Sequence, residues 1–307
     1  MSPTSIAPWE DGARTDDSAG TYEWWYFDAH LADGAKLVVT FMNKDIAEPQ
    51  KPLSPLLRLD LDLPDGRHFE KLAHHPSSAW SAAKDHADVR LGENRFTGDL
   101  HQYRIEASAE EISVDVTLTG QVPLWRPSTG HMLFGADRSL EFAWLPAVPQ
   151  GAVTAAYSVG GEQHETTGVG YHDHNWGNVG LMKVVNDWYW ARGQAGPYSV
   201  IASYVTSAKQ YGFEPIPIFM LARDNVLVGD NPANVTFERA ALYGRHDRQA
   251  RGRDDALHLS ERRGPLRGLL HPHPRLVGDP DGRRSQGRQT RRCQAGSLRR
   301  CLPAVCR

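Results

Sequence analysis

Residues 112–119 read Ile-Ser-Val-Asp-Val-Thr-Leu-Thr, so apolar and polar side chains alternate without a break. Successive side chains of a β-strand point to opposite sides, and the pattern therefore predicts a strand with one buried and one solvated face. Residues 57–63 repeat it with four leucines. We expect further strands at residues 36–43, 187–192, 198–206, 216–223, 226–228 and 235–242, and a hairpin over residues 157–164 that turns at Gly160-Gly161.

The predicted strands are short and frequent, and no stretch has the period of a long amphipathic helix. The 28 glycines and 20 prolines fit many turns, such as the one expected at Asp224-Asn225. Many short strands predict an all-β sandwich or barrel, and a barrel removes exposed strand edges. A chain of 307 residues has room for one large or two ordinary domains.

The composition excludes several classes of protein. With 40% hydrophobic and 23% charged residues, the chain resembles an ordinary globular protein. It has no apolar run long enough to cross a bilayer, and its first residues lack the basic and apolar segments of a secretion signal. We therefore expect a cytoplasmic protein without stable membrane insertion.

The charge is divided unevenly along the chain. Residues 1–244 contain 18 Lys and Arg against 31 Asp and Glu, whereas residues 245–307 contain 16 Arg, no Lys and 6 acidic residues. The second stretch also lacks aromatic residues and any regular alternation, and its Cys293, Cys301 and Cys306 lack the paired spacing of a zinc site. This composition is typical of a GC-rich gene read out of frame. We expect residues 245–307 to be non-native or disordered, without packed β-structure, rather than a nucleic-acid-binding arm.

The first segment with chemical content is residues 22–30, Tyr-Glu-Trp-Trp-Tyr-Phe-Asp-Ala-His. In a strand, Tyr22, Trp24, Tyr26, Asp28 and His30 share one face, and Glu23, Trp25, Phe27 and Ala29 share the other. Aromatic bodies with polar tips are typical of a ligand-binding surface. A structural aromatic cluster closing one end of a barrel is the other interpretation.

The second segment is residues 168–178, Gly-Val-Gly-Tyr-His-Asp-His-Asn-Trp-Gly-Asn. A strand here would place His172, His174 and Trp176 on one face and Tyr171, Asp173 and Asn175 on the other. Consecutive polar side chains are costly to bury without a role. They could orient a substrate or transfer protons, form a hydrogen-bonded junction, or ligate a metal with His30, His131 or His164. No further ligand has a recognisable spacing, so we expect no metal.

Together the two segments resemble the signatures of the hydroxyneurosporene synthase (carotenoid 1,2-hydratase) family, which is related to lipocalin-like hydratases and Diels–Alderases. The resemblance is specific at these segments and general over residues 15–240. It implies two tandem lipocalin-like β-barrel domains, at residues 1–180 and 181–244, with the second incomplete. It also implies a ligand cavity and no organic cofactor. His174 and Trp176 match the family's functional His-x-Trp, whereas Tyr204-Val205-Thr206 lacks the aspartate of the expected Tyr-x-Asp.

Hydration of an isolated alkene needs a strong acid, and burial raises the pKa of a carboxyl group so that it can supply the proton. We therefore expect a cofactor-independent hydratase or cyclase that acts on a hydrophobic unsaturated metabolite, such as a polyene, terpenoid or polyketide. The predicted catalytic residues are Asp28, Asp173 and His174, with His174 orienting the acid or the substrate. The predicted substrate-binding residues are Glu23, Trp24, Trp25, Tyr26, Tyr171, His172, Asn175, Trp176, Trp188, Trp190 and Tyr204.

Two other functions fit the same residues. A Diels–Alderase-type pericyclase would need only a shaped apolar pocket and one hydrogen bond to polarise a carbonyl group. A non-catalytic lipocalin-like carrier would need only the pocket, which would leave Asp173 and His174 unexplained. Removal of the acid should abolish a reaction that begins with protonation of a carbon atom, and it should leave the binding function of a carrier intact.

Overall fold

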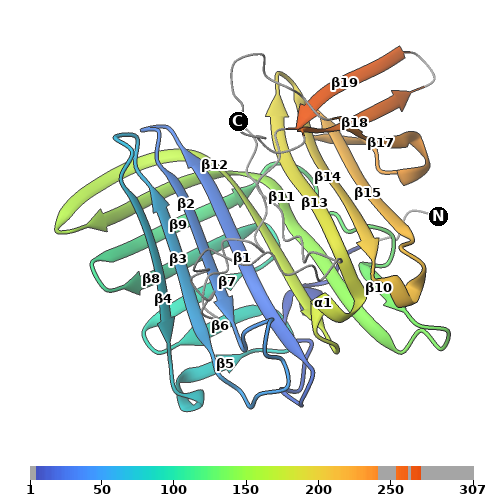
Figure 1. The fold of residues 1–307 in the computed structure, drawn as a ribbon. Helices are drawn as coiled ribbons and strands as arrows, with labels where there is room; N and C mark the ends of the chain where they lie inside the picture. Colours follow the sequence, from blue (N-terminus) through green and yellow to red (C-terminus); the bar gives the residue numbers. More distant parts are fainter. Residues whose placement is uncertain (1–4, 241–253, 262–263, 271–307) are drawn as a thin grey trace, which may run out of the picture. The chain divides into compact units, whose positions relative to one another are not determined.

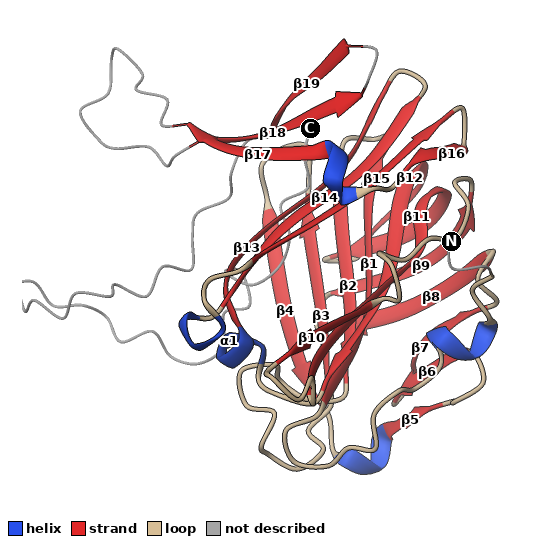
Figure 2. Ribbon diagram, turned by 90° about the vertical axis from the view of Figure 1, so that its right-hand side faces the viewer, coloured by secondary structure: helices blue, strands red, loops and turns tan. Residues whose placement is uncertain are grey.

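The computed structural model describes residues 5–240, 254–261 and 264–270. Its regular structure is almost entirely β (Figure 2), and the helical segments of the described residues are short: one α-helix, α1 (Leu181–Val184), and four 3-10 helices at Pro8–Asp11, Ser77–Ala79, Lys209–Tyr211 and Pro232–Asn234. No helix in these residues is long and apolar enough to span a membrane. The predicted all-β fold class is confirmed.

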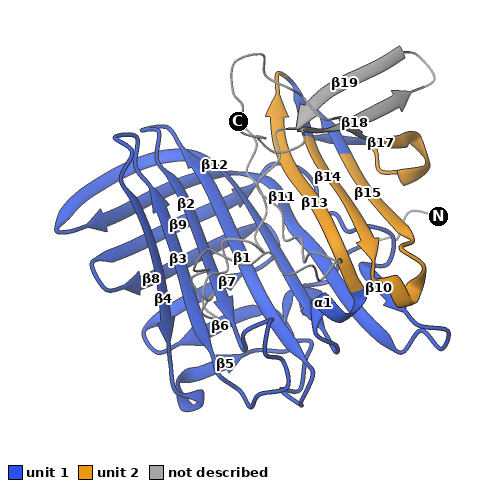
Figure 3. Cartoon of the chain, in the orientation of Figure 1, with its two compact units in different colours: residues 1–184, 197–199, 221–228 blue, residues 185–196, 200–220, 229–307 orange. Residues whose placement is uncertain are grey.

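The chain divides into two compact units (Figure 3). Unit 1 comprises residues 1–184, 197–199 and 221–228, and unit 2 comprises residues 185–196, 200–220 and 229–307. The predicted domain limits at residues 180 and 244 stay a prediction.

Unit 1 contains one sheet of twelve strands that follow one another as neighbours (Figure 1). The order is β4 (His68–His74), β3 (Leu56–Asp62), β2 (Lys36–Met42), β1 (Tyr22–Leu31), β12 (Glu162–Gly177), β11 (Leu140–Val159), β9 (Ile112–Gly120), β8 (Gln102–Ala109), β7 (Asn94–Gly98), β6 (Ala87–Leu91) and β5 (Trp80–Ala82), with β10 (His131–Phe134) beside β11. The sheet curls into a half-barrel, because side chains from its early and late strands fill one core.

The alternation in the sequence determines which side chains enter this core. Leu57, Leu59 and Leu61 of β3 are fully buried in it, as are Val116 and Leu118 of β9. The hairpin between β11 and β12 turns at Gly160-Gly161, as predicted, and both glycines have positive φ angles. Positive φ strains other residues, so glycine suits this turn.

The remaining strands form two smaller sheets. The first has the order β13 (Val185–Ala195), β14 (Tyr198–Ser207), β15 (Pro215–Arg223) and β16 (Val226–Gly229). Asp224 and Asn225 both have positive φ, as a tight turn between β15 and β16 requires. The second sheet contains β17 (Val235–Ala240), β18 (Asp254–Glu261) and β19 (Gly264–Leu270).

The last sheet corrects one prediction. Strands β18 and β19 lie beyond residue 245 and pair antiparallel with each other, and β18 also pairs with β17. The expectation of no β-structure in this stretch is therefore wrong for residues 254–261 and 264–270. The alternation here is confined to residues 257–260, Leu-His-Leu-Ser, and arginines lie on both sides of it. Residues 271–307, with all three cysteines, lie outside the described residues.

Candidate active site

The two segments singled out in the sequence are neighbouring strands. β1 pairs antiparallel with β12 along ten residues, so that Trp25 lies opposite His174 and Tyr26 opposite Asp173. The hydrogen bond between the His172 ring and the Tyr26 carbonyl joins residues 146 positions apart. Both motifs therefore belong to one site.

The predicted site residues divide between the two faces of these strands. The inner face, which points into the core of unit 1, carries Glu23, Trp25, His172, His174 and Trp176, and the outer face carries Trp24, Tyr26, Asp28, Tyr171, Asp173 and Asn175. The period-two grouping from the sequence is thus confirmed. Its consequence is that the two predicted acids lie on one face and the predicted histidine on the other.

On the inner face, Asp11 connects both histidines to the barrel wall. It ends a short 3-10 turn, Pro8–Asp11, and is buried. Its Oδ2 accepts hydrogen bonds from the Tyr103 hydroxyl (2.6 Å) and from His172 Nε2 (3.2 Å), while His172 Nδ1 donates to the carbonyl oxygen of Tyr26 (2.9 Å). Trp25 Nε1 donates to the Asp11 carbonyl oxygen (2.9 Å). The network attaches the N-terminal turn to the sheet.

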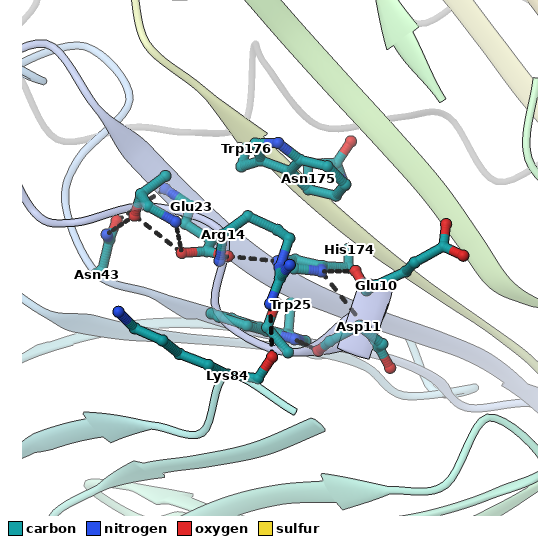
Figure 4. Close-up of polar contacts among 12 residues, drawn as sticks. Glu10, Asp11, Arg14, Glu23, Trp25, Asn43, Lys84, His174, Asn175 and Trp176 are labelled. Carbon is teal, nitrogen blue, oxygen red and sulfur yellow. Dashed lines mark hydrogen bonds and ion pairs between the residues drawn. The ribbon is translucent and has the colours of Figure 1, made fainter. Parts of the chain in front are cut away.

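His174 lies between Glu23 and Asp11 (Figure 4). Its Nε2 is 2.8 Å from Glu23 Oε1, its Nδ1 is 3.5 Å from Asp11 Oδ1, and its ring stacks on Trp25 with centroids 4.3 Å apart. Arg14 N also donates to Glu23 Oε1 (2.5 Å). The expectation that His174 orients Asp173 is wrong, because adjacent residues of a strand point to opposite faces.

The histidine partners on the inner face are all acceptors. His174 Nδ1 also lies 3.3 Å from the carbonyl oxygen of Glu10. Among the described residues, no group of three or more His, Cys, Asp or Glu side chains has an arrangement suited to a metal ion. The prediction of no metal stays a prediction.

Asp173 accepts three side-chain hydrogen bonds on the outer face. Its Oδ2 accepts from the Tyr171 hydroxyl (2.7 Å) and from Trp144 Nε1 (2.8 Å), and its Oδ1 accepts from Asn175 Nδ2 (2.6 Å). Asp173 is 5% exposed. A carboxylate has about four acceptor positions, so these three bonds leave room on Oδ1 for one more partner.

Burial raises the pKa of Asp173 from 3.8 to about 6, because desolvation penalises the charged carboxylate. The hydrogen bonds from Tyr171, Trp144 and Asn175 act in the opposite direction, since they stabilise the charge. The two effects together give a carboxyl group that gains and loses its proton near neutral pH. Such a group suits general acid catalysis.

Aromatic rings surround this acid on the outer face. Trp24 stacks between Tyr22 and Phe142, with centroids 5.8 and 6.0 Å away. Tyr26 meets Tyr171 edge-on at 6.3 Å. Asp28 lies opposite Tyr171 in the register of β1 and β12 and is 1% exposed. The outer face thus combines a large apolar area with few polar groups, as ligand-binding surfaces do.

The remaining predicted residues belong to unit 2. Trp188 and Trp190 lie on β13, and Tyr204 lies on β14, where its ring stacks on Phe237 at 4.2 Å. Thr206, which replaces the expected aspartate, donates its hydroxyl to Asp187 Oδ1 (3.0 Å). Their role in substrate binding stays a prediction.

Sequence reasoning missed two partners of the site. Asp11 precedes the first strand by eleven residues, at the end of a short 3-10 turn, and Trp144 lies in β11, which is predicted from the sequence only from residue 157 onward. The acidic Glu10-Asp11 pair after Pro8-Trp9 was the available signal for Asp11. Trp144 had a weaker signal, as one tryptophan in an apolar stretch.

A separate cavity of about 330 Å³ opens among β7, β8, β9, β11 and β12. Its walls include Glu93, Glu106, Asp115 and one aromatic residue, Tyr157. None of the predicted site residues lines it, and its acidic walls do not suit a hydrophobic ligand.

Comparison with known proteins identifies the family. The family model described as Diels-Alderase-like matches residues 16–240, which is most of the chain. The chain belongs to the Diels-Alderase-like family. The resemblance inferred from the two signature segments is therefore confirmed, and both segments lie within the matched region.

Two relatives of the chain are named after reactions of natural products. The quinolone epoxide rearrangement protein asqO of Emericella nidulans is 26% identical over 197 residues, which are 60% of this chain and 54% of that protein. The hydroxyneurosporene dehydrogenase of Chlorobaculum tepidum is 26% identical over 238 residues, 67% of this chain and 62% of that protein. The chain thus matches little more than half the length of these curated relatives.

The fold also matches solved structures. The crystal structure of CghA with Sch210972 superposes with a TM-score of 0.61 at 16% identity, covering 92% of this chain and 86% of that chain. The likeness shows the fold alone at this identity. It confirms the lipocalin-like fold class, with a curled half-barrel sheet and two smaller sheets.

Proposed function

We propose that the protein is a cofactor-independent enzyme that acts on a hydrophobic, unsaturated metabolite, with Asp173 as its general acid. The single observation that carries the proposal is the Asp173 carboxyl group, buried among Trp144, Tyr171 and Asn175 with a pKa of about 6. Membership of the Diels-Alderase-like family supports the proposal, as do relatives named for epoxide rearrangement and carotenoid chemistry.

The reaction begins with proton transfer from Asp173 to an alkene carbon or an epoxide oxygen. The substrate then carries positive charge, which the ring of Tyr26 stabilises because the π-systems of aromatic rings attract cations. Capture of the cation by water gives hydration, and capture by another part of the same molecule gives cyclisation or rearrangement. The Asp173 carboxylate recovers its proton from the product or from water.

Asp173 is a better acid for this reaction than the two other predicted catalytic residues. Asp28 shares the outer face and lies opposite Tyr171, whose pKa is raised by burial first, then by Asp173 and, to a smaller degree, by Asp28. His174 is bound to Glu23 on the inner face. We therefore assign Asp28 to shaping the electrostatics of the outer face and His174 to holding the N-terminal turn.

The proposal is tested with Asp173→Asn, which removes the donated proton with little change of shape. Wild-type protein and the variant are incubated with lipophilic extracts of the producing cell, and the extracts are compared by mass spectrometry. The wild-type protein should convert one of the metabolites. The variant should bind the same metabolite but convert it at least about 100-fold more slowly than the wild type.

The matched control is Asp115→Asn, which changes an exposed acid on β9 and should convert the metabolite like the wild type. Equal conversion by Asp173→Asn and wild type would rule out Asp173 as the acid and favour a pericyclase. A metabolite that both proteins bind and neither changes would identify a carrier.

A further inference from the structure

A row of polar side chains extends from Asp173 across the outer face of unit 1. In the strand register, Asp173 of β12 lies opposite Tyr26 of β1, Tyr26 lies opposite Thr40 of β2, and Thr40 lies opposite Arg58 of β3. Exposure is 2% for Tyr26, 0% for Thr40 and 3% for Arg58. These side chains do not belong to the hydrophobic core cluster. Asp60 lies two residues after Arg58 on β3, so its side chain is on the same face of the strand. We call Thr40, Arg58 and Asp60 the polar row.

The polar row has three buried atoms with unused hydrogen-bonding capacity. Within the part of the chain that the structure describes, Thr40 Oγ1, Arg58 Nη1 and Asp60 Oδ1 have no hydrogen-bond partner. Leaving a buried donor or acceptor unsatisfied typically costs about 1–3 kcal/mol. Of the eight buried side-chain atoms without a partner in the described residues, these three lie together on the adjacent strands β2 and β3, where one ligand group could satisfy all of them.

The charges of the polar row limit what it can bind. The Arg58 guanidinium contacts Asp60 Oδ2 at 2.7 Å and Glu70 Oε1 at 3.3 Å. Two carboxylates therefore share one positive charge, and no excess positive charge remains for an anionic ligand. Arg58 Nη1 is a donor, Asp60 Oδ1 an acceptor, and the Thr40 hydroxyl can act as either. These three atoms are together complementary to an uncharged ligand group that both accepts and donates hydrogen bonds.

An apolar row lies directly beside the polar row. Trp24 of β1 is opposite Met42 of β2, and Met42 is opposite Leu56 of β3, all of them buried. A substrate along the outer face would therefore meet apolar side chains over most of its length and hydrogen-bonding groups at one end.

We propose that the polar row binds an amide-type group of the substrate, a carbonyl with an adjacent N–H, at a fixed distance from the acid. The carbonyl oxygen accepts from Arg58 Nη1 and the Thr40 hydroxyl, and the N–H donates to Asp60 Oδ1. Adjacent strands are about 4.8 Å apart, so Thr40 and Arg58 lie about 10 and 14 Å from Asp173 along the sheet. The inference rests on the proposed function, because it takes the group protonated by Asp173 as the other end of the substrate.

The test compares two probes of similar length. Cinnamanilide contains an amide between two phenyl groups, and 1,4-diphenylbutadiene has two phenyl groups and no amide. Equilibrium dialysis with mass-spectrometric detection measures the binding of each probe to the whole protein. Wild type should bind the amide at least ~10-fold more tightly than the hydrocarbon, the scale expected for hydrogen bonds to a charged donor.

The decisive variant is Thr40→Val, which replaces an unpartnered hydroxyl with a methyl group of similar size. Its melting temperature should equal or exceed that of the wild type, since no hydrogen bond within the protein is lost. Its preference for the amide should fall about 5-fold, while its hydrocarbon binding stays unchanged. Arg58→Lys keeps the charge, removes the Nη1 donor and should likewise lower the preference. Thr117→Val on β9 is the control and should leave both affinities unchanged.

Each result has a clear meaning. An unaltered amide preference in Thr40→Val and Arg58→Lys would overturn the inference, as would equal binding of the two probes by the wild type, and the proposed function would stand in both cases. Failure of the wild type to bind either probe would count against the inference and the proposed hydrophobic substrate together. A lower melting temperature for Thr40→Val would show that its hydroxyl has a structural role and would also overturn the inference.

Discussion

Asp173 and His174 are adjacent in the sequence, yet their side chains take part in separate hydrogen-bond networks on opposite faces of β12. Asp173 binds Trp144, Tyr171 and Asn175, whereas His174 binds Glu23 and stacks on Trp25. One strand thus supplies a candidate acid to one face and a structural anchor to the other. Substitutions at these two positions should have different effects.

The stability of the protein should decrease with pH through the titration of Asp173. Its pKa is about 6 in the folded protein against 3.8 for the free group, so the folded state binds the proton more tightly. This contribution is fully present below pH 3.8, decreases as the pH rises through 6 and is constant above that. Relative to Asp173→Asn, the wild type should lose up to about 3 kcal/mol of unfolding free energy between pH 4 and pH 7.

Urea unfolding of both proteins at a series of pH values measures this difference. The variant can differ from the wild type by a constant, because its amide alters the hydrogen bond with Asn175. Only the pH dependence of the difference in unfolding free energy between the two proteins reports the titration of Asp173. Parallel stability curves would show that Asp173 has an ordinary pKa in the folded state.

The pH dependence of turnover should move when Trp144 is changed. An enzyme that needs protonated Asp173 loses activity above about pH 6, tenfold for each further pH unit. Trp144→Phe removes a hydrogen bond that stabilises the carboxylate, so the pKa of Asp173 should rise and the decline should begin at higher pH. The measurement is kcat/KM against pH. Trp80→Phe, on β5, should leave the profile in place.

Removal of one partner from the pair formed by His174 and Glu23 should destabilise the fold. Glu23→Gln removes the carboxylate that His174 Nε2 contacts at 2.8 Å, and disturbing the partner of a buried polar group typically costs about 1–3 kcal/mol. His174→Gln should have a similar effect. The double variant should be less destabilised than the sum of the two, which a double-mutant cycle by urea unfolding measures. Additive effects would mean that the pair does not interact.

The glycines of β12 allow its neighbouring strands to lie close to it. A Cβ atom at Gly168 would lie 2.3 Å from the carbonyl oxygen of His30 on β1. Gly168→Ala should therefore force the two strands apart and cost about 1–3 kcal/mol. Gly193→Ala on β13 is the matched control, because nothing lies within 4 Å of its added methyl group. The melting temperature should fall for the first variant and stay level or rise for the second.

Much of the fold could be predicted because alternation reports burial directly. Residues 57–63 and 112–119 differ on their two sides, and both form strands with the expected face buried. Strand β4 escaped prediction because neither of its faces is fully buried, so its sequence has little alternation. Strand β18 escaped because charged neighbours dilute a short alternating stretch.

The sequence predicts which residues of the site share a strand face, but it does not predict which strands pair to bring them together. The sequence indicates which of Tyr171, His172, Asp173 and His174 share a face, because that depends only on the period of a strand. It does not indicate that β1 pairs with β12, since register between distant strands depends on the whole sheet. Asp11 and Trp144 were missed for the same reason, as each becomes a partner only through tertiary contacts.

The pairing of β1 with β12 also determines when the site can form during synthesis. The two strands meet across 146 residues, and a ribosome that adds about 5–20 residues per second needs roughly 7–30 s to reach the second from the first. Throughout that time the edge of β1 that later binds β12 has no partner from its own sheet. The emerging chain thus carries an aromatic strand open to wrong pairing, and molecular chaperones that shield strand edges should raise the yield of this protein in the cell.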